Sequence, residues 1–287
     1  MKQYRFFTAV LVIAALLTLS SCESDTAEGG QGDFGGQEQQ SSSKEEIVFP
    51  ELTPLASWYE VESFLEANAP TDLAEFYENY NTIMFKRGKL ERKVVGDFNC
   101  AVDKEYGMAI ILSYAGSADF SGELVIPAEI DGCRVIVGYA MDTLPEGVTS
   151  LVVEDGVQAL MNDCASPNLT SVTLPDSLLV LSGGTFTGCP LTEIDLPDSL
   201  YVADACSNTQ ITEITFPENM IYVNGFGNSS LTSVTFEGDH VLALGEYAFW
   251  RCGNLTTIQI PNSVKYIHPQ AFLETSVTVP TEKIFNP

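Results

Sequence analysis

The chain has 287 residues, 45% of them hydrophobic, so it is long enough to form one or two domains with hydrophobic cores and is not disordered throughout. Its 39 Asp and Glu residues outnumber 13 Lys and Arg, and the formal net charge of −26 disfavours binding to nucleic acid, which depends on basic residues that neutralise phosphates. The two histidines, His240 and His268, are too few for a histidine cluster, which disfavours catalysis that needs one.

Residues 1–21 have the features of a signal peptide. Lys2 and Arg5 precede an apolar run over 6–19. This run is too short to span roughly 30 Å of hydrocarbon comfortably, but it fits the hydrophobic region of a signal peptide. The run ends in Leu19-Ser20-Ser21-Cys22, which resembles the lipobox of bacterial lipoproteins. That resemblance implies cleavage before Cys22 and lipidation of its thiol, which would anchor the chain to a membrane; the alternative is an ordinary secretory signal.

Residues 22–48 are rich in Gly, Gln, Ser and acidic residues and contain few apolar ones. Such a composition is typical of a flexible chain that forms no core. We therefore predict a disordered, lipid-anchored tether. The acidic residues directly after Cys22 resemble a surface-export signal of some outer-membrane lipoproteins, and they are equally consistent with solvated linker charge.

The hydrophobic period changes in residues 49–98, where we predict a small helical region. Apolar residues from Leu55 to Leu65 fit one helix that ends near 68–70. Thr71 is suited to cap a second helix, whose apolar side runs from Leu73 to Met84. The basic residues that follow fit either a docking site for an acidic partner or favourable charge at a helix C-terminus.

Seven segments share a pattern in which an apolar residue is followed by Thr and then by further apolar residues at alternate positions. They begin at Val148, Leu169, Leu191, Ile211, Leu231, Leu255 and Val277, at spacings of 20 to 24 residues. One copy has too few apolar residues for a core of its own, whereas stacked coils with strands about 4.8 Å apart share a continuous core. A Pro after most of these segments would end the strand.

These repeats resemble the leucine-rich repeats of the BspA-like family. Residues 255–272 match best, with Pro261 and Ser263 after the strand, a second apolar pair and then Ala271-Phe272. The resemblance covers 99–287 and implies a β-rich leucine-rich-repeat solenoid of about seven repeats. Short parallel strands would stack in an arc, with turns and short 3-10 or α segments on the other side, after the small helical segment.

Three further expectations concern the interior of this solenoid. Phe186, Phe249 and Phe272 should fill the space between its two walls. The coils 191–210 and 211–230 lack the Ala-Phe element and should be thinner. A strand at 108–114 should cover one end of the sheet, which would otherwise be exposed.

Residues suited to catalysis or metal binding are sparse. No C-x-x-C motif is present and neither histidine stands at ligand spacing, so we expect no metal, no cofactor and no catalytic residue. Six cysteines follow Cys22, and export would allow them to form disulfides, whereas related repeats carry Cys as a small buried hydrophobe. Both states are open for Cys100, Cys133, Cys164, Cys189, Cys206 and Cys252.

Strand alternation predicts which repeat residues point outward. They form a broad polar surface, the candidate face, with an acidic centre at Glu193, Asp195 and Glu213. Solenoids bind partners through such faces because residues from successive coils act together. The candidate face consists of Ser171, Thr173, Glu193, Asp195, Glu213, Thr215, Ser233, Thr235, Thr257 and Gln259.

The BspA-like resemblance implies a cell-surface protein involved in adhesion. We therefore expect an exported, non-enzymatic protein that is anchored to the bacterial cell envelope through lipid on Cys22 and faces the outside of the cell. Its candidate face would bind a protein or glycan ligand, and no nucleic acid. The alternative is a structural envelope component that scaffolds a partner lipoprotein.

Overall fold

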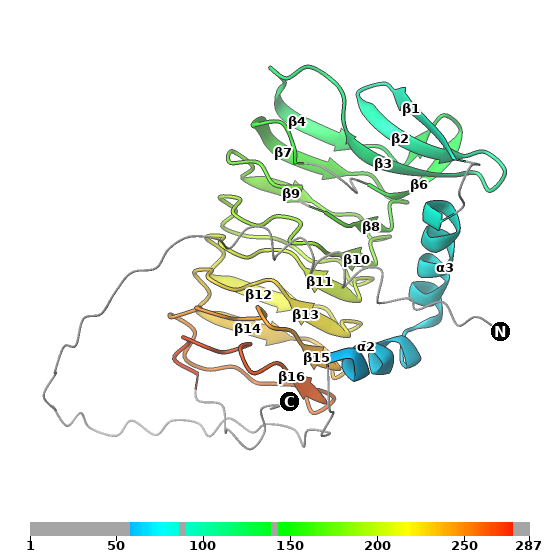
Figure 1. Ribbon diagram of the computed structural model, residues 1–287. Helices are drawn as coiled ribbons and strands as arrows, with labels where there is room; N and C mark the ends of the chain where they lie inside the picture. Colours follow the sequence, from blue (N-terminus) through cyan, green and yellow to red (C-terminus); the bar gives the residue numbers. More distant parts are fainter. Residues whose placement is uncertain (1–57, 86–89, 139–142, 163, 278–287) are drawn as a thin grey trace, which may run out of the picture.

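The computed structural model describes residues 58–85, 90–138, 143–162 and 164–277. In Figure 1 these residues form a solenoid of stacked coils with two helices along one side. The predicted signal peptide, tether and lipidation site at Cys22 lie outside the described residues.

The two helices are α2 (Trp58–Ala67) and α3 (Thr71–Phe85). Pro70 separates them, and the amide of Ala74 donates a hydrogen bond of 2.9 Å to the Pro70 carbonyl in the first turn of α3. The Asn68 side chain donates to the Phe64 carbonyl at 2.7 Å and satisfies one carbonyl at the end of α2. The prediction of two helices with a break at 68–70 is confirmed.

An eleven-stranded sheet forms one side of the solenoid, and we call its parallel part, from β3 onward, the back wall. The strands β1, β2 and β3 pair antiparallel at one end. The predicted strand at 108–114 is present as β3, but β1 and not β3 lies at the edge of the sheet. From β3 the parallel order is β3, β6, β8, β10, β11, β13, β15 and β16. The short β5 pairs with β6. Their bounds are β1 (Glu91–Val95), β2 (Phe98–Asp103), β3 (Met108–Tyr114), β5 (Glu129–Ile130), β6 (Cys133–Val137), β8 (Ala159–Leu160), β10 (Val180–Leu181), β11 (Val202–Asp204), β13 (Tyr222–Asn224), β15 (Ala243–Leu244) and β16 (Tyr266–Ile267).

The opposite side, the front wall, holds the repeat segments that carry the candidate face. Its strands form two separate parallel sheets, one of β4 (Ser121–Ile126), β7 (Gly147–Val153) and β9 (Ser171–Thr173), the other of β12 (Glu213–Phe216) and β14 (Ser233–Phe236). The equivalent segments 191–196 and 255–260 are extended without a strand ladder. The leucine-rich-repeat solenoid is confirmed, and the structure adds that the wall expected to contain turns and short helices is the continuous sheet.

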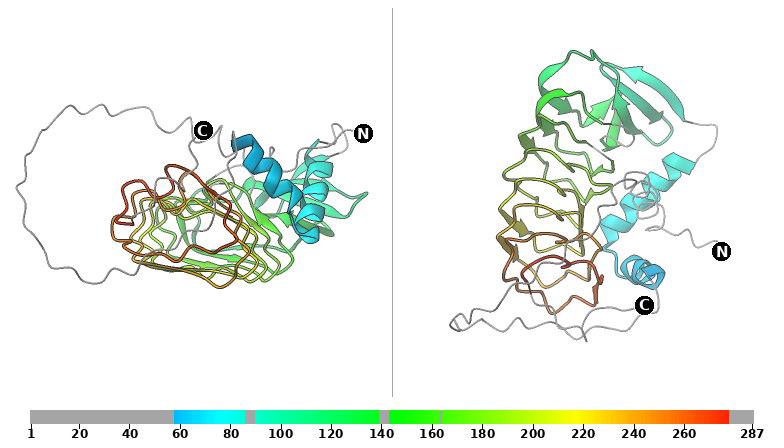
Figure 2. Two further views of the ribbon diagram at one scale, coloured as in Figure 1. Left: turned by 90° about the horizontal axis from the view of Figure 1, so that it is seen from below. Right: turned by 60° about the vertical axis from the view of Figure 1, so that its left-hand side comes forward.

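The back wall is buried on both faces. Leu181, Val223 and Leu244 point into the space between the walls and belong to the central core. Their strand neighbours Val180 and Tyr222 belong to a second cluster that contains the apolar side chains of α2 and α3. The helices therefore cover the outer face of the back wall, and Figure 2 shows them outside the stacked coils. Strands buried on both faces read as continuous apolar runs, as these do.

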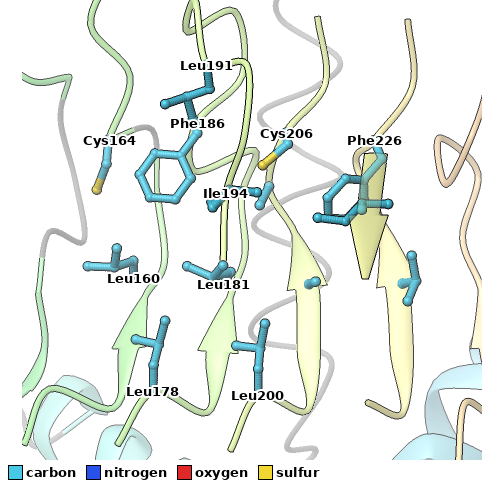
Figure 3. Packing of buried hydrophobic residues seen from close by; sticks show 14 of the residues in the cluster. Leu160, Cys164, Leu178, Leu181, Phe186, Leu191, Ile194, Leu200, Cys206 and Phe226 are labelled. Carbon is cyan, nitrogen blue, oxygen red and sulfur yellow. The ribbon is translucent and has the colours of Figure 1, made fainter. Parts of the chain in front are cut away.

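A row of core side chains fills the space between the walls. Phe186, Phe249 and Phe272 are buried as predicted. The prediction that coil 211–230 lacks such a ring is wrong, because Phe226 is 1% exposed and occupies the equivalent place, its amide bonded to the next coil at Tyr247. In coil 191–210 the place belongs to Cys206, as the row of Phe186, Cys206 and Phe226 in Figure 3 shows.

Candidate binding face

All ten residues of the candidate face are exposed in the structure. The apolar residues between them point inward, with Ile194 at 8%, Ile214 at 3% and Val234 at 9% exposure. This alternation is the outcome that the period-2 pattern predicts for a wall with core on one side and water on the other.

Strand register brings part of the candidate face together. Glu213 pairs with Ser233 and Thr215 with Thr235 across β12 and β14, so their side chains stand beside each other. The segment with Glu193 and Asp195 lies between β9 and β12 without joining either ladder. The front wall is therefore one polar surface built from short ladders and separate extended segments.

The carboxylates offer a physical reason for one interruption of the ladder. Glu193 and Asp195 lie in the coil next to Glu213, and all three are exposed. Like charges on directly opposite residues destabilise a strand pair. No lysine or arginine belongs to the candidate face, so nothing on this surface neutralises the carboxylates.

Three of the described cations form ion pairs away from the candidate face. Lys93 and Lys104 both contact Asp131 beside the antiparallel end of the sheet, and this contact lowers the pKa of the Asp131 carboxyl. Arg251 pairs with Glu274 at 3.0 Å. The front wall therefore presents net negative charge over the acidic coils.

A hollow of about 690 Å³ lies in the front wall between the last two described coils. We call it the groove; residues 232–236, 238–239 and 257–262 line it. It includes Ser233, Thr235, Thr257 and Gln259, four of the ten residues of the candidate face. The alternation pattern identified these side chains but not the groove. The available signal was length, because the coil from Leu231 to Leu255 is four residues longer than the one before it.

The described cysteines are suited to packing rather than to chemistry. All six are buried as thiols in the structure, which favours the reduced form. Burial raises the pKa of Cys100 to about 11 and raises the pKa of Cys206 as well, so neither is a reactive thiolate at neutral pH. Within 58–85, 90–138, 143–162 and 164–277, no three His, Cys, Asp or Glu residues gather as a metal site would require.

The two histidines lie in turns of the coils. His240 Nδ1 lies 2.9 Å from the Glu218 carbonyl, and burial lowers the pKa of His268. Neither histidine belongs to the candidate face.

Across the described part of the chain, no helix has both the length and the apolar character to cross a membrane.

Comparison with solved structures finds leucine-rich repeat proteins of low similarity to this chain. A leucine-rich repeat protein from Bacteroides ovatus is 20% identical with a TM-score of 0.47, over 66% of this chain and 59% of that one. A leucine rich cell surface protein from Faecalibacterium prausnitzii is 21% identical with a TM-score of 0.46, over 65% and 55%. The T. pallidum leucine rich repeat protein is 15% identical with a TM-score of 0.38, over 62% and 85%. The chain thus spans less than two thirds of the first two proteins.

Comparison with protein families is more specific. No protein with curated function matches the chain. Residues 158–278 match the BspA type leucine rich repeat region in six copies. Leucine-rich repeat domains generally mediate protein binding, and BspA-like proteins are typically found at the cell surface. Residues 158–278 of the two-walled solenoid are therefore BspA-type leucine-rich repeats.

Proposed function

We propose that this chain is a non-enzymatic binding protein, exported and anchored to the bacterial cell surface through lipid on Cys22. Its candidate face binds a protein or glycan ligand and thereby mediates adhesion. The predicted tether would hold the solenoid at some distance from the membrane, where the front wall can meet a ligand.

The observation that carries this proposal is the contrast between the two walls. The outer face of the back wall is covered by α2 and α3, with Phe64 packed edge-on against Tyr266 at 5.3 Å and Tyr201 bonded to Asp72 at 2.9 Å. The front wall exposes polar residues from successive coils. A solenoid face of this kind supports recognition because many coils act together.

Binding is tested on an array of extracellular matrix proteins, glycans and bacterial surface proteins. Any ligand found is then tested against the double variant Glu193→Lys with Glu213→Lys, which reverses charge at the acidic centre of the face. The matched control is Glu75→Lys with Glu78→Lys, two exposed positions on α3. We expect the face variant to lose binding at least about tenfold and the control to keep it.

Anchoring is tested separately by labelling cells with an alkyne fatty acid and by shaving intact cells with protease. Wild type should incorporate the label and lose residues 99–287 to the protease, and Cys22→Ala should incorporate none. If the array yields no specific ligand and crosslinking captures a constant partner from the same cell, the scaffold role is favoured instead.

A further inference from the structure

Main chain lines both sides of the groove. Consecutive residues 232–236 form one side and consecutive residues 257–262 the other. In an extended segment, alternate side chains point to opposite faces, so an unbroken run along a hollow exposes the edge of the backbone. The groove is thus bounded by two parallel stretches of peptide groups.

One of these edges has unused hydrogen-bonding capacity. β14 pairs with β12 along one side only. Over the described residues, no backbone hydrogen bond joins 232–236 to 255–262. The same two coils are joined in the back wall, where Ala243 pairs with Tyr266 and Leu244 with Ile267. The coils are therefore stacked at the back and separated at the front.

The extra residues after β14 account for this separation. Gly238 approaches Glu218 of the preceding coil so closely that a Cβ there would meet the Glu218 main chain. The ring of His240 contacts the carbonyl of the same residue at 2.9 Å. The longer turn therefore packs against the preceding coil. At the end of the groove, Asp239 accepts a hydrogen bond of 2.8 Å from the amide of Ser263.

The surroundings of the groove are acidic. Asp239 lines it, Glu237 is exposed beside it, and Glu213 stands next to Ser233 in the strand pair. No lysine or arginine lines the groove. Val234, Ile258 and Ile260 also lie along it, but their side chains belong to the core and are each at most 9% exposed. A ligand that fits has a free main-chain edge and positive charge.

We propose that the groove binds an extended, lysine- or arginine-bearing peptide segment of a partner protein, which adds as a strand between β14 and residues 255–260. Main-chain hydrogen bonds to the edge of β14 supply affinity, and the acidic rim selects cationic side chains. This inference rests on the proposed function, because it names the ligand class for one part of the candidate face.

The test is calorimetric titration of the full-length protein with an acetylated, amidated octapeptide of alternating Lys and Val. Three comparison peptides are used. One replaces every Lys by Glu, and the other two carry N-methyl groups at alternate residues, one peptide for each register. We expect saturable binding of the Lys peptide, at least about tenfold weaker binding of both methylated peptides, and none of the Glu peptide. Equal affinity for the methylated and unmethylated peptides would overturn the inference.

A double variant locates the site. Thr235→Arg with Thr257→Arg fills the groove from two exposed positions and adds positive charge, so we expect at least about tenfold weaker binding of the Lys peptide. Ser171→Arg with Thr173→Arg adds the same charge to the same face outside the groove and should bind like wild type. Thermal unfolding of each variant checks that it remains folded.

The two proposals fail in different ways. If an array ligand is lost with the Glu193→Lys and Glu213→Lys variant but kept by the groove variant, the face binds as proposed and the groove inference is overturned. If the groove variant binds the Lys peptide like wild type, the inference is overturned whatever the array shows.

Discussion

Replacement of Asp204 by Asn should stabilise the protein at neutral pH. Asp204 ends β11 and hydrogen-bonds with the Asn224 side chain of the next coil. Gly225 approaches it with φ of +68°, a conformation that favours glycine, and a Cβ there would collide with the Asp204 carboxyl. Burial raises the pKa of this carboxyl from 3.8 to about 6, and the Asn224 hydrogen bond offsets only part of the increase.

The direction of the pH effect follows from proton binding. In the unfolded chain the carboxyl titrates near 3.9. Between that pH and about 6, the native state binds more protons than the unfolded state, so the free energy of unfolding contributed by this group falls as pH rises. A difference of two pKa units corresponds to a loss of at most roughly 3 kcal/mol in the free energy of unfolding. Because Asp204 is partly exposed, we expect the Asn variant to gain roughly 1–2 kcal/mol at neutral pH.

The measurement is urea unfolding of wild type and Asp204→Asn from pH 3.5 to 8. The variant should match wild type near pH 3.5 and exceed it increasingly up to pH 7, because Asn keeps the shape of the side chain without the charge. Asp176→Asn, at an exposed position, serves as the control for removal of a surface carboxylate. A stability difference that does not change with pH would refute the reasoning.

Three further predictions concern packing. Phe226→Ala should lower the free energy of unfolding by about 3–5 kcal/mol, because the buried ring packs edge-on against Phe216 at 5.0 Å. Cys206→Ala, at the equivalent place in the neighbouring coil, should lower it by roughly 1 kcal/mol. Urea unfolding of the two variants and wild type measures both values. Leu65→Ala in α2 should lower the free energy of unfolding by roughly 2–5 kcal/mol and speed amide hydrogen exchange in the back wall. The control, Ser63→Ala at an exposed position of the same helix, should stay within about 0.5 kcal/mol of wild type. Because the six buried cysteines are thiols, dithiothreitol should leave the thermal midpoint unchanged, and a lowered midpoint would indicate a disulfide.

The front wall was predictable because its pattern is local. In Glu213-Ile214-Thr215-Phe216, exposed and buried residues alternate as the sequence alternates, since one side meets the core and the other meets water. The exposure of the whole candidate face follows from this single rule. The groove does not, because it depends on how an inserted turn packs against the preceding coil.

The back wall was harder to predict because each of its repeat strands is two or three residues long. A pair such as Tyr222-Val223 is apolar at both positions, and so short a run does not distinguish a strand from a turn. Its outer covering also comes from far away in sequence, as the bond between Asp72 and Tyr201 shows. Similarly, Phe226 follows Gly225 rather than an Ala, so the Ala-Phe motif does not detect it. The hydrogen-bond register nevertheless places its ring in the same row as the other core phenylalanines.

The helices also bear on which surface can bind. A solenoid of two walls has two outer faces, and on this one the apolar residues of α2 and α3 cover the back wall from Met108 to Tyr266. Binding there would require displacement of buried side chains such as Leu65 and Phe76, each at most 1% exposed. Binding at the front wall requires no such displacement. The same helices hold the coils together at the back, which allows the front wall to interrupt its ladder and leave an edge of β14 for a ligand.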